Sequence, residues 1–432
     1  MSALSRRAVI TGIGIISPIG LDVASFWRSL QEGKSGIRPI QSFDASGLPV
    51  RIAGEIPNFN AKDYLEKENR KSLRVMARTI QLAVAGAQRA IDDGKVDKSK
   101  LDPTRFGVEF GAGLIATELN DLIEASCVSA NCQPDRVDLE KWGDLGIPAI
   151  QPLWMLKYLP NMLACHVSIL HDARGPNNSI TESDVASLLA LGEAYRILMR
   201  DQADFFLVGG AESKINPLSM VRQCLFEHLS KKNEEPTRAC RPFDRSRDGL
   251  VLGEGAGVFV VEDLEHARRR GAHIYAEIIG FGAAFDPNLR GNGLARATRA
   301  ALNEAGIGPE EVDHVNAHGL STPESDSWEA RSLQEIFGNC SPPVPVFAAK
   351  SYIGNLGAGG STTELAASVL AMSTSGVVPP TLNYEHADPG CPIAVLSREP
   401  RPMTRPYVVK VSFTQMGQCA AIVVRRWNEG AN

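Results

Sequence analysis

The chain has 432 residues, of which 44% are hydrophobic and 22% are charged, and this composition is ordinary for a globular protein. Its formal net charge of -5 does not favour nucleic acid as a ligand. No run of about 18 apolar residues is present, and the N-terminal stretch lacks the apolar core of a signal peptide, so we expect no membrane span and a cytoplasmic location. The eight cysteines lack the spacing of a zinc site, and we predict reduced thiols, no metal and no other cofactor.

Short β-branched or apolar runs alternate along the chain with stretches of helical periodicity. The runs predict strands at 8–14, 106–113, 205–210, 257–263, 314–319, 346–350, 408–413 and 420–426. The helical spacing predicts helices at 78–93, 185–199, 293–306 and 362–375. Such alternation favours α/β layers, and helix 185–199 is apolar on nearly every side and should be buried. Residues 125–150 have poor periodicity and many turn formers, which predicts a surface insertion.

A weak internal repeat suggests how the chain is divided. The segment YAEIIGFGAAF (275–285) has the pattern of AVITGIGIIS (8–17), which indicates two related halves with a seam near 264–273. We therefore predict an N-terminal half at 1–263 and a C-terminal half at 264–432.

Polar residues and glycines gather in segments that follow or end predicted strands. These segments are GPNNSITESD (175–184), NAHGLSTPESD (316–326), KSYIGNLGAGG (350–360) and SFTQMGQ (412–418). In open α/β sheets the loops at the carboxyl ends of strands build the functional site, so we expect these segments to converge.

The chain resembles the type II β-ketoacyl-acyl-carrier-protein synthases, members of the thiolase-like superfamily. The resemblance includes the Gly-Pro pair at 175–176, NAHGLSTP and KSYIGNLGAGG, together with VITGIGIISPIG, VGGAES and RPFDRSRDGLVLGEGAGVFVVED. The resemblance runs from Arg7 to about Arg426, almost the whole chain. It implies a five-layer α-β-α-β-α fold built from two duplicated halves. It also implies a dimer, and acyl chains carried by an acyl carrier protein as substrates.

The resemblance further implies where the catalytic positions lie. In that family a cysteine at the start of a buried helix attacks the acyl thioester, and two histidines then drive decarboxylation of malonyl carrier protein. This sequence has Asp184 at the cysteine position, His318 at the first histidine position and Asn355 at the second. Lys350 matches the family pattern, and the nearest cysteine, Cys165, lies on the wrong side of the Gly-Pro turn.

Four more positions are implied to contact the acyl substrate. Thr322 matches the family pattern, Phe413 lies in the closing segment, and Gln415 stands where the family has a gating phenylalanine. Trp154 lies in a segment that, in the family, crosses the dimer interface and lines the acyl tunnel of the partner subunit. Its bulky ring would either set the length of chain that fits or simply fill the tunnel.

Replacing the cysteine with Asp184 changes what the site can do. A thiolate is a good nucleophile, whereas a carboxylate that attacked a thioester would form a mixed anhydride, less stable than the thioester it replaced. Aspartate is a preferred N-cap residue, so we expect Asp184 to cap the helix that follows it. Beside an ionised Asp184, His318 should hold its proton. Decarboxylation at such a site is disfavoured.

A basic segment lies where the related synthases dock acidic carrier protein. Lys67, Arg70 and Lys71 make up this patch, and Lys232, next to Lys231, lies near a second docking position. An ordinary solvated helix is the alternative interpretation, because glutamates interleave with the cations.

Three functional hypotheses follow. In the first, the chain is a non-condensing partner subunit that resembles the chain-length factors of type II polyketide systems and forms a heterodimer with a competent ketosynthase. In the second, it is an enzyme of the same acyltransferase family that uses Asp184 and His318 for a different reaction on carrier-bound acyl chains. In the third, it is a homodimeric binder of carrier protein.

Overall fold

The strands of the N-terminal half form one side of a large mixed sheet. The computed structural model describes residues 6–130, 133, 136–288 and 291–428. In spatial order the strands of this half are β5 (Asn177–Ile180), β4 (Phe106–Ala112), β6 (Phe205–Ser213), β7 (Glu254–Asp263) and β1 (Ala8–Ile16). The first three run parallel to one another, and β7 is antiparallel to both β6 and β1.

The C-terminal half repeats this strand order and these directions. Its strands, in matching spatial order, are β10 (Pro345–Phe347), β9 (Val312–Asn316), β14 (Tyr407–Phe413), β15 (Gln418–Arg426) and β8 (Ala276–Phe285), with the short β12 (Ala394–Val395) beside β10. The strands β10, β9 and β14 are parallel, and β15 is antiparallel to its two neighbours. A short antiparallel contact between β1 and β8 joins the two half-sheets.

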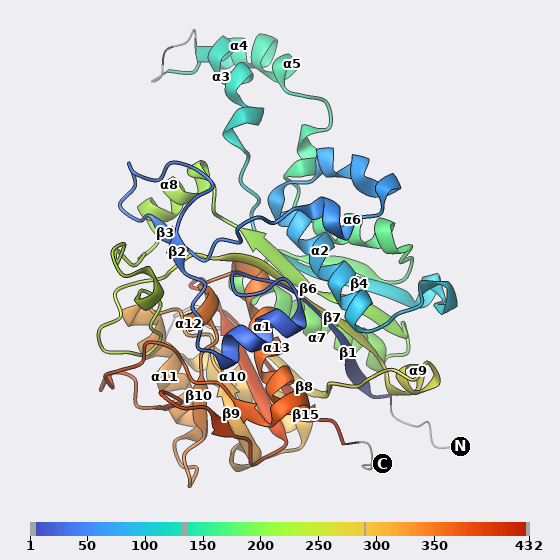
Figure 1. The fold of residues 1–432 in the computed structure, drawn as a ribbon, viewed down its shortest axis with the longest axis vertical. Helices are drawn as coiled ribbons and strands as arrows, with labels where there is room; N and C mark the ends of the chain where they lie inside the picture. Colours follow the sequence, from blue (N-terminus) through green and yellow to red (C-terminus); the bar gives the residue numbers. More distant parts are fainter. Residues whose placement is uncertain (1–5, 131–132, 134–135, 289–290, 429–432) are drawn as a thin grey trace.

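Helices cover both half-sheets and also fill the space between them (Figure 1). The helices α2 (Arg78–Asp93) and α6 (Met162–His171) pack on the N-terminal half-sheet, and α10 (Asn292–Ala305) packs on the C-terminal one, next to α11 (Pro323–Phe337). Between the half-sheets lie α7 (Ala186–Met199) and α13 (Gly360–Leu370), which contact strands of both halves. This arrangement confirms the predicted five-layer α-β-α-β-α fold.

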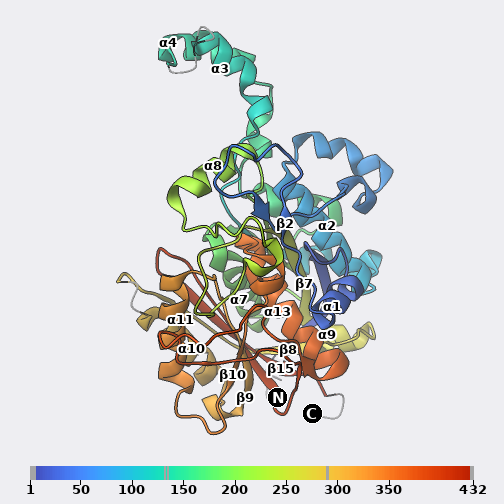
Figure 2. The same cartoon turned by 60° about the vertical axis from the view of Figure 1, so that its left-hand side comes forward.

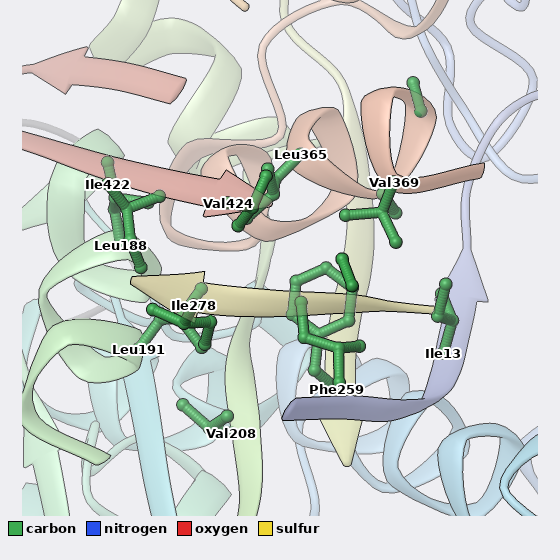
Figure 3. Packing of buried hydrophobic residues seen from close by; sticks show 14 of the residues in the cluster. Ile13, Leu188, Leu191, Val208, Phe259, Ile278, Leu365, Val369, Ile422 and Val424 are labelled. Carbon is green, nitrogen blue, oxygen red and sulfur yellow. The ribbon is translucent and has the colours of Figure 1, made fainter. Parts of the chain in front are cut away.

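The central layer is the main apolar core, and its composition explains why both helices are buried. Figure 3 shows side chains of this cluster converging from α7, α13 and strands of both halves: Ile13, Leu188, Leu191, Val208, Phe259, Ile278, Leu365, Val369, Ile422 and Val424. Helix α13 also carries many small residues, which let its backbone approach the sheet. A Cβ atom on Gly257 of β7 would lie 2.4 Å from the Thr363 backbone nitrogen of α13.

The observed elements differ from the predicted ones mainly at their ends. Helix α13 stops at Leu370 and continues as a π-helical turn, Ala371–Ser375. The predicted strand 346–350 is cut short because Lys350 opens the short helix α12 (Lys350–Ile353). Strand β5 lies within a segment that the sequence suggested only as a loop. The remaining longer helices are α1 (Val23–Gln31), α8 (Pro217–Phe226) and α9 (Leu264–Arg269).

The predicted surface insertion is a helical arm that projects from the body of the molecule (Figures 1 and 2). We define the arm as residues 119–150; Cys132 and three neighbours lie outside the described residues. It contains α3 (Ile123–Ala130), α4 (Leu139–Lys141), a π-helical turn and α5 (Ile147–Ala149). Large apolar side chains are exposed along it: Leu119, Ile123, Val128, Val137, Leu139, Leu145 and Ile147.

The end of β7 at Asp263 coincides with the division between halves expected from the sequence, and we keep 1–263 and 264–432 as the proposed halves. The sheet and helix pattern on either side of this point supports that division. Among the described residues, none of the helices has the length and apolar character needed to cross a membrane.

Candidate active site

Asp184 lies between β5 and α7, at the N-terminal end of the central layer. The residue before it, Ser183, has a left-handed backbone with φ of 49°, and residues 183–185 form a 3-10 turn. The Asp184 carboxylate accepts a hydrogen bond of 2.9 Å from the side-chain amide of Asn355. Helix α7 begins at Ala186, and its N-cap residue is Val185, which makes no side-chain capping bond. The predicted capping role of Asp184 is therefore wrong, because the carboxylate turns towards Asn355.

His318 follows β9 and is completely buried. Its Nδ1 lies 3.0 Å from the Lys350 ammonium and 3.2 Å from the Ser412 hydroxyl, while its Nε2 has no partner among the described residues. Burial, together with the positive charges of Lys350 and Lys410, holds the pKa of His318 well below its usual value. The prediction of a protonated His318 is wrong, because these groups outweigh the influence of Asp184.

The hydrogen-bond network assigns the tautomer of this neutral ring. An ammonium group can only donate, so Nδ1 of His318 accepts from Lys350 and the ring proton resides on Nε2. The site therefore presents an imidazole that can donate a hydrogen bond without carrying a charge.

A buried network of ion pairs holds the Lys350 ammonium next to the His318 ring. The Glu364 carboxylate of α13 lies 2.6 Å from the Lys350 ammonium and also binds the ammonium of Lys410 from β14. Burial alone would raise the pKa of Glu364, but the two lysines hold it below its usual value. Lys410 was not anticipated from the sequence; the signal was a lone lysine inside the apolar strand VVKVSF.

Two buried carboxylates of α11 hold the loop that carries His318. Glu329 accepts hydrogen bonds from the backbone amides of His318 (2.6 Å) and Gly319 (2.8 Å), and Asp326 accepts from the amides of Ser321 and Phe243. Burial raises the pKa of Glu329 to about 7 and that of Asp326 to about 6.

Further charged groups surround Asp184 that sequence reasoning missed. The ammonium of Lys214 lies 3.3 Å from Glu212. Burial would lower the pKa of Lys214, but Glu212, Asp184 and Glu227 together raise it. Glu227 in turn accepts a hydrogen bond of 3.1 Å from the side chain of Gln415. Glu212 and Lys214 lie at the end of β6, whereas Glu227 follows α8, so no contiguous motif links the three residues.

Three of the four residues predicted to contact substrate line one cavity, and the fourth does not. Thr322, Phe413 and Gln415 line a cavity of about 420 Å³, which we call the mouth cavity. Trp154 is not among its lining residues; its ring packs 5.4 Å from that of Tyr158, beside the cluster formed by α2 and α6. The role predicted for Trp154 stays a prediction.

The predicted docking cations fall into two kinds. Lys67, Arg70 and Lys71 are exposed on a 3-10 helix, Lys67–Val75, and none of them forms an ion pair with another described residue. Lys232 is half-buried, donates to the backbone oxygen of Ser246 at 2.9 Å and lies 3.9 Å from Asp248. Internal contacts thus occupy Lys232. Of the other three cations, Arg70 donates a hydrogen bond of 3.3 Å to the backbone oxygen of Leu65, and all three stay exposed to solvent.

Within the described part of the chain, no group of three or more histidine, cysteine, aspartate or glutamate residues is arranged to hold a metal ion. The side-chain groups gathered at the site include the Asp184 carboxylate, the Asn355 amide, the neutral imidazole of His318 and the ammonium of Lys214.

The five layers, and a site at the start of a buried central helix, define a thiolase-like protein of the ketosynthase type. Residues 5–267 match the family described as "Beta-ketoacyl synthase, N-terminal domain", and residues 275–385 match "Beta-ketoacyl synthase, C-terminal domain". The chain belongs to the β-ketoacyl synthase family, which confirms the resemblance found in the sequence.

Named relatives are similar over nearly the whole chain. The 3-oxoacyl-[acyl-carrier-protein] synthase 2 of Coxiella burnetii is 36% identical over 98% of this chain and 99% of the relative. The corresponding synthase of Vibrio harveyi is also 36% identical, with the same coverage.

Solved structures of the same type superpose over 98% of this chain and all of theirs. A β-ketoacyl synthase from Burkholderia phymatum has a TM-score of 0.87 at 28% identity. The ishigamide ketosynthase/chain length factor has a TM-score of 0.84 at 28% identity. A type II polyketide ketosynthase in complex with its acyl carrier protein has a TM-score of 0.82 at 27% identity.

Proposed function

We propose that this chain takes part in building fatty-acid or polyketide chains on an acyl carrier protein, as the non-condensing partner subunit of a competent ketosynthase. The observation that carries the proposal is Asp184, whose carboxylate accepts a hydrogen bond from Asn355. The family resemblance in the sequence implies that the nucleophile would stand at this position. The similarity to a ketosynthase/chain length factor and to 3-oxoacyl-carrier-protein synthases supports the biochemical setting.

Two physical effects oppose condensation at this site. Acyl transfer to the carboxylate would replace a thioester with a less stable mixed anhydride. The same negative charge would also repel an enolate that formed about 4 Å away, by about 4 kcal/mol at an effective dielectric constant of about 20. Neither effect depends on His318. Its imidazole stays neutral and contacts the Lys350 ammonium through Nδ1, so Nε2–H remains a hydrogen-bond donor.

The arm supports the assignment of a partner subunit. Its exposed apolar side chains, of which Leu139 is 81% exposed, are unfavourable in water and are typical of a surface that another subunit covers. A condensing ketosynthase is the partner that would supply the nucleophile missing from this chain.

The direct test of Asp184 is to restore sulfur at its position. We expect the Asp184→Cys variant to carry a covalent acyl group after incubation with butyryl carrier protein, because a helix N-terminus favours the thiolate. Wild-type protein should stay unmodified when both are compared by intact-protein mass spectrometry. An acyl group on wild-type protein would refute the proposed loss of condensing chemistry.

The test of the partnership is co-expression with a cysteine-containing synthase from the same gene neighbourhood. We expect the two chains to purify together in equal amounts and to elute as a heterodimer in size exclusion with light scattering. Recovery of this chain only as a homodimer, with the synthase eluting separately, would contradict the proposal.

A second candidate function is acid–base catalysis on carrier-bound acyl chains. The observation that favours it is the intact support of His318: a neutral ring, an Nε2–H with no partner, and the buried Lys350–Glu364–Lys410 network. In this case Asp184→Asn, which keeps the shape of the side chain but removes its charge, should lower turnover of acyl carrier protein by at least 100-fold. Unchanged turnover would exclude Asp184 as the base.

A further inference from the structure

Lys410 is a buried cation of the site that lies outside the motifs recognised in the sequence. It belongs to β14, and its side chain is completely buried. Its ammonium binds the Glu364 carboxylate and donates a hydrogen bond of 2.9 Å to the backbone oxygen of Ala317, the residue before His318. Taking an ammonium group out of water is unfavourable, so an apolar residue would serve better here if packing were the only requirement.

The second lysine leaves the buried network of ion pairs with an excess of positive charge. The Oε1 atom of Glu364 lies 2.6 Å from the Lys350 ammonium, and the Oε2 atom binds the ammonium of Lys410. Two ammonium groups therefore share one carboxylate, whereas Lys350 alone would be balanced by it. Because the Lys350 ammonium contacts Nδ1 of His318 at 3.0 Å, the excess positive charge lies next to the imidazole ring.

The two acids of α11 that face this region do not cancel the excess charge. Glu329 accepts a hydrogen bond of 2.6 Å from the backbone amide of His318, and burial raises its pKa to about 7, so its carboxyl group is only partly ionised near neutral pH. Asp326 lies 3.5 Å from Arg247, which balances its charge. The charges that shift the pKa of the His318 ring are those of the two lysines, and both lower it.

We propose that Lys410 is a positioning residue that keeps His318 an uncharged hydrogen-bond donor, with its ring proton on Nε2. A second proton on the ring would add positive charge where positive charge is already in excess. The bond from Lys410 to the Ala317 oxygen also holds the backbone next to the ring. His318 then donates a hydrogen bond to an oxygen of a bound carbonyl or enolate and does not carry protons between groups.

This role of Lys410 narrows the second candidate function and does not depend on the first. If the site performs acid–base catalysis, Asp184 is the group that takes up the proton, and His318 only polarises the ligand. The state of the His318 ring can be measured in the protein without any substrate, so failure of the proposed partnership would leave the role of Lys410 open to its own test.

The test is NMR of the full-length protein, in the assembly it forms, with isotopically labelled histidines and with His318→Gln to assign the ring signals. We expect the wild-type ring to stay neutral, with its proton on Nε2, down to about pH 5. Lys410→Met keeps a long unbranched side chain but removes the charge. In this variant at least tenfold more of the ring should be protonated at each pH, which brings its titration into the range between about pH 5 and pH 7.

A merely structural role for Lys410 predicts a different result, namely a less stable Lys410→Met protein whose His318 ring stays neutral, and that result would overturn the proposal. Lys100→Met is the control, because it removes a charge of the same sign from an exposed 3-10 turn. It should leave the ring as neutral as in wild type. An equal rise in protonation of the ring in both variants would also overturn the proposal.

A measurement on the unaltered protein covers the case in which Lys410→Met does not fold. Burial lowers the pKa of Lys410 to about 8, so its ammonium should lose its charge as the pH rises past this value. We expect the Nε2 signal of His318 to shift with a midpoint near pH 8, although the ring itself does not titrate there. Absence of such a transition between about pH 7 and pH 9 would overturn the proposal.

Discussion

At the scale of single residues, Asp184 and Asn355 form a matched pair. A carboxylate accepts hydrogen bonds, an amide can donate them, and the two side chains meet at 2.9 Å. A histidine at position 355 that remained neutral would offer one donor, whereas the amide offers two and has no charge to titrate. Asp184 and Asn355, which the resemblance implies to stand at the cysteine and second histidine positions, thus form one interaction in the structure.

Glu109 on β4 provides a pH-dependent prediction. It is 1% exposed, one carboxyl oxygen has no partner among the described residues, and burial, with a smaller contribution from Glu193, raises its pKa to about 8. In the unfolded chain the pKa returns to about 4.5, so between these values the native state binds more protons and stability falls as pH rises. This one group should contribute a slope of about 1.4 kcal/mol per pH unit.

We therefore expect Glu109→Gln to flatten the fall in unfolding free energy between pH 5 and pH 8 and to be more stable than wild type at pH 8. Denaturant unfolding at several pH values measures both quantities. Glu265→Gln is the exposed control and should leave the profile unchanged. A Glu109→Gln profile parallel to that of wild type would show that the native carboxyl does not titrate as described.

At the scale of elements, the close approach of α13 to β7 depends on Gly257. A methyl group at this position would meet backbone and side-chain atoms of Thr363 at 2.4 and 2.5 Å, and the helix is packed between two half-sheets. We expect Gly257→Ala to lower the free energy of unfolding by about 3 kcal/mol, as measured by denaturant titration. Gly47→Ala has no atom within 4 Å of its new methyl group and should change stability by less than about 0.5 kcal/mol. Equal effects would contradict this account of the packing.

The arm exposes apolar side chains that another subunit could cover. Replacing Leu139 and Ile147 with aspartate should weaken subunit association at least tenfold, because burial of either side chain contributes roughly 1.5–3 kcal/mol. Sedimentation measures association, and thermal unfolding should show little change because both side chains are exposed. Phe285→Asp, at an exposed site outside the arm, is the control. Unchanged association in the arm variant would exclude the arm as an interface.

At the scale of the whole molecule, the net charge of the chain and the charge of one surface patch have opposite signs. The chain is acidic overall, yet Lys67, Arg70 and Lys71 are exposed together and form no ion pairs with the described residues. An acidic carrier protein would be attracted to this patch at close range but not by the charge of the chain as a whole.

Reversal of these three charges to glutamate should weaken binding of carrier protein at least tenfold and reduce its dependence on salt. Surface plasmon resonance at two ionic strengths measures both effects. The same reversal at Lys95, Lys98 and Lys100 gives an equal change in net charge at another exposed site and should have little effect. If both triple variants lose affinity equally, the patch is not a specific docking site.

The candidate site was only partly predictable from the sequence. Motif positions led us to expect Asp184, His318 and Lys350 near one another. In the structure His318 contacts Lys350, and the Ser412 hydroxyl contacts both His318 and the backbone oxygen of Asp184. The sequence could not reveal that the Asp184 carboxylate faces Asn355, which is 171 residues away along the chain. It also gave the wrong protonation for His318, since burial and two lysines from other elements decide that pKa.

The amino-acid sequence by itself determined the α/β class and the family, because periodicity and contiguous motifs are local properties of the chain. Only the tertiary structure decided that Asp184 makes a hydrogen bond instead of a helix cap, that Trp154 lies away from the mouth cavity, and that aromatic and acidic side chains meet there. These contacts and placements depend on distances between residues that are far apart in the sequence. They also depend on how deeply the tertiary fold buries each side chain.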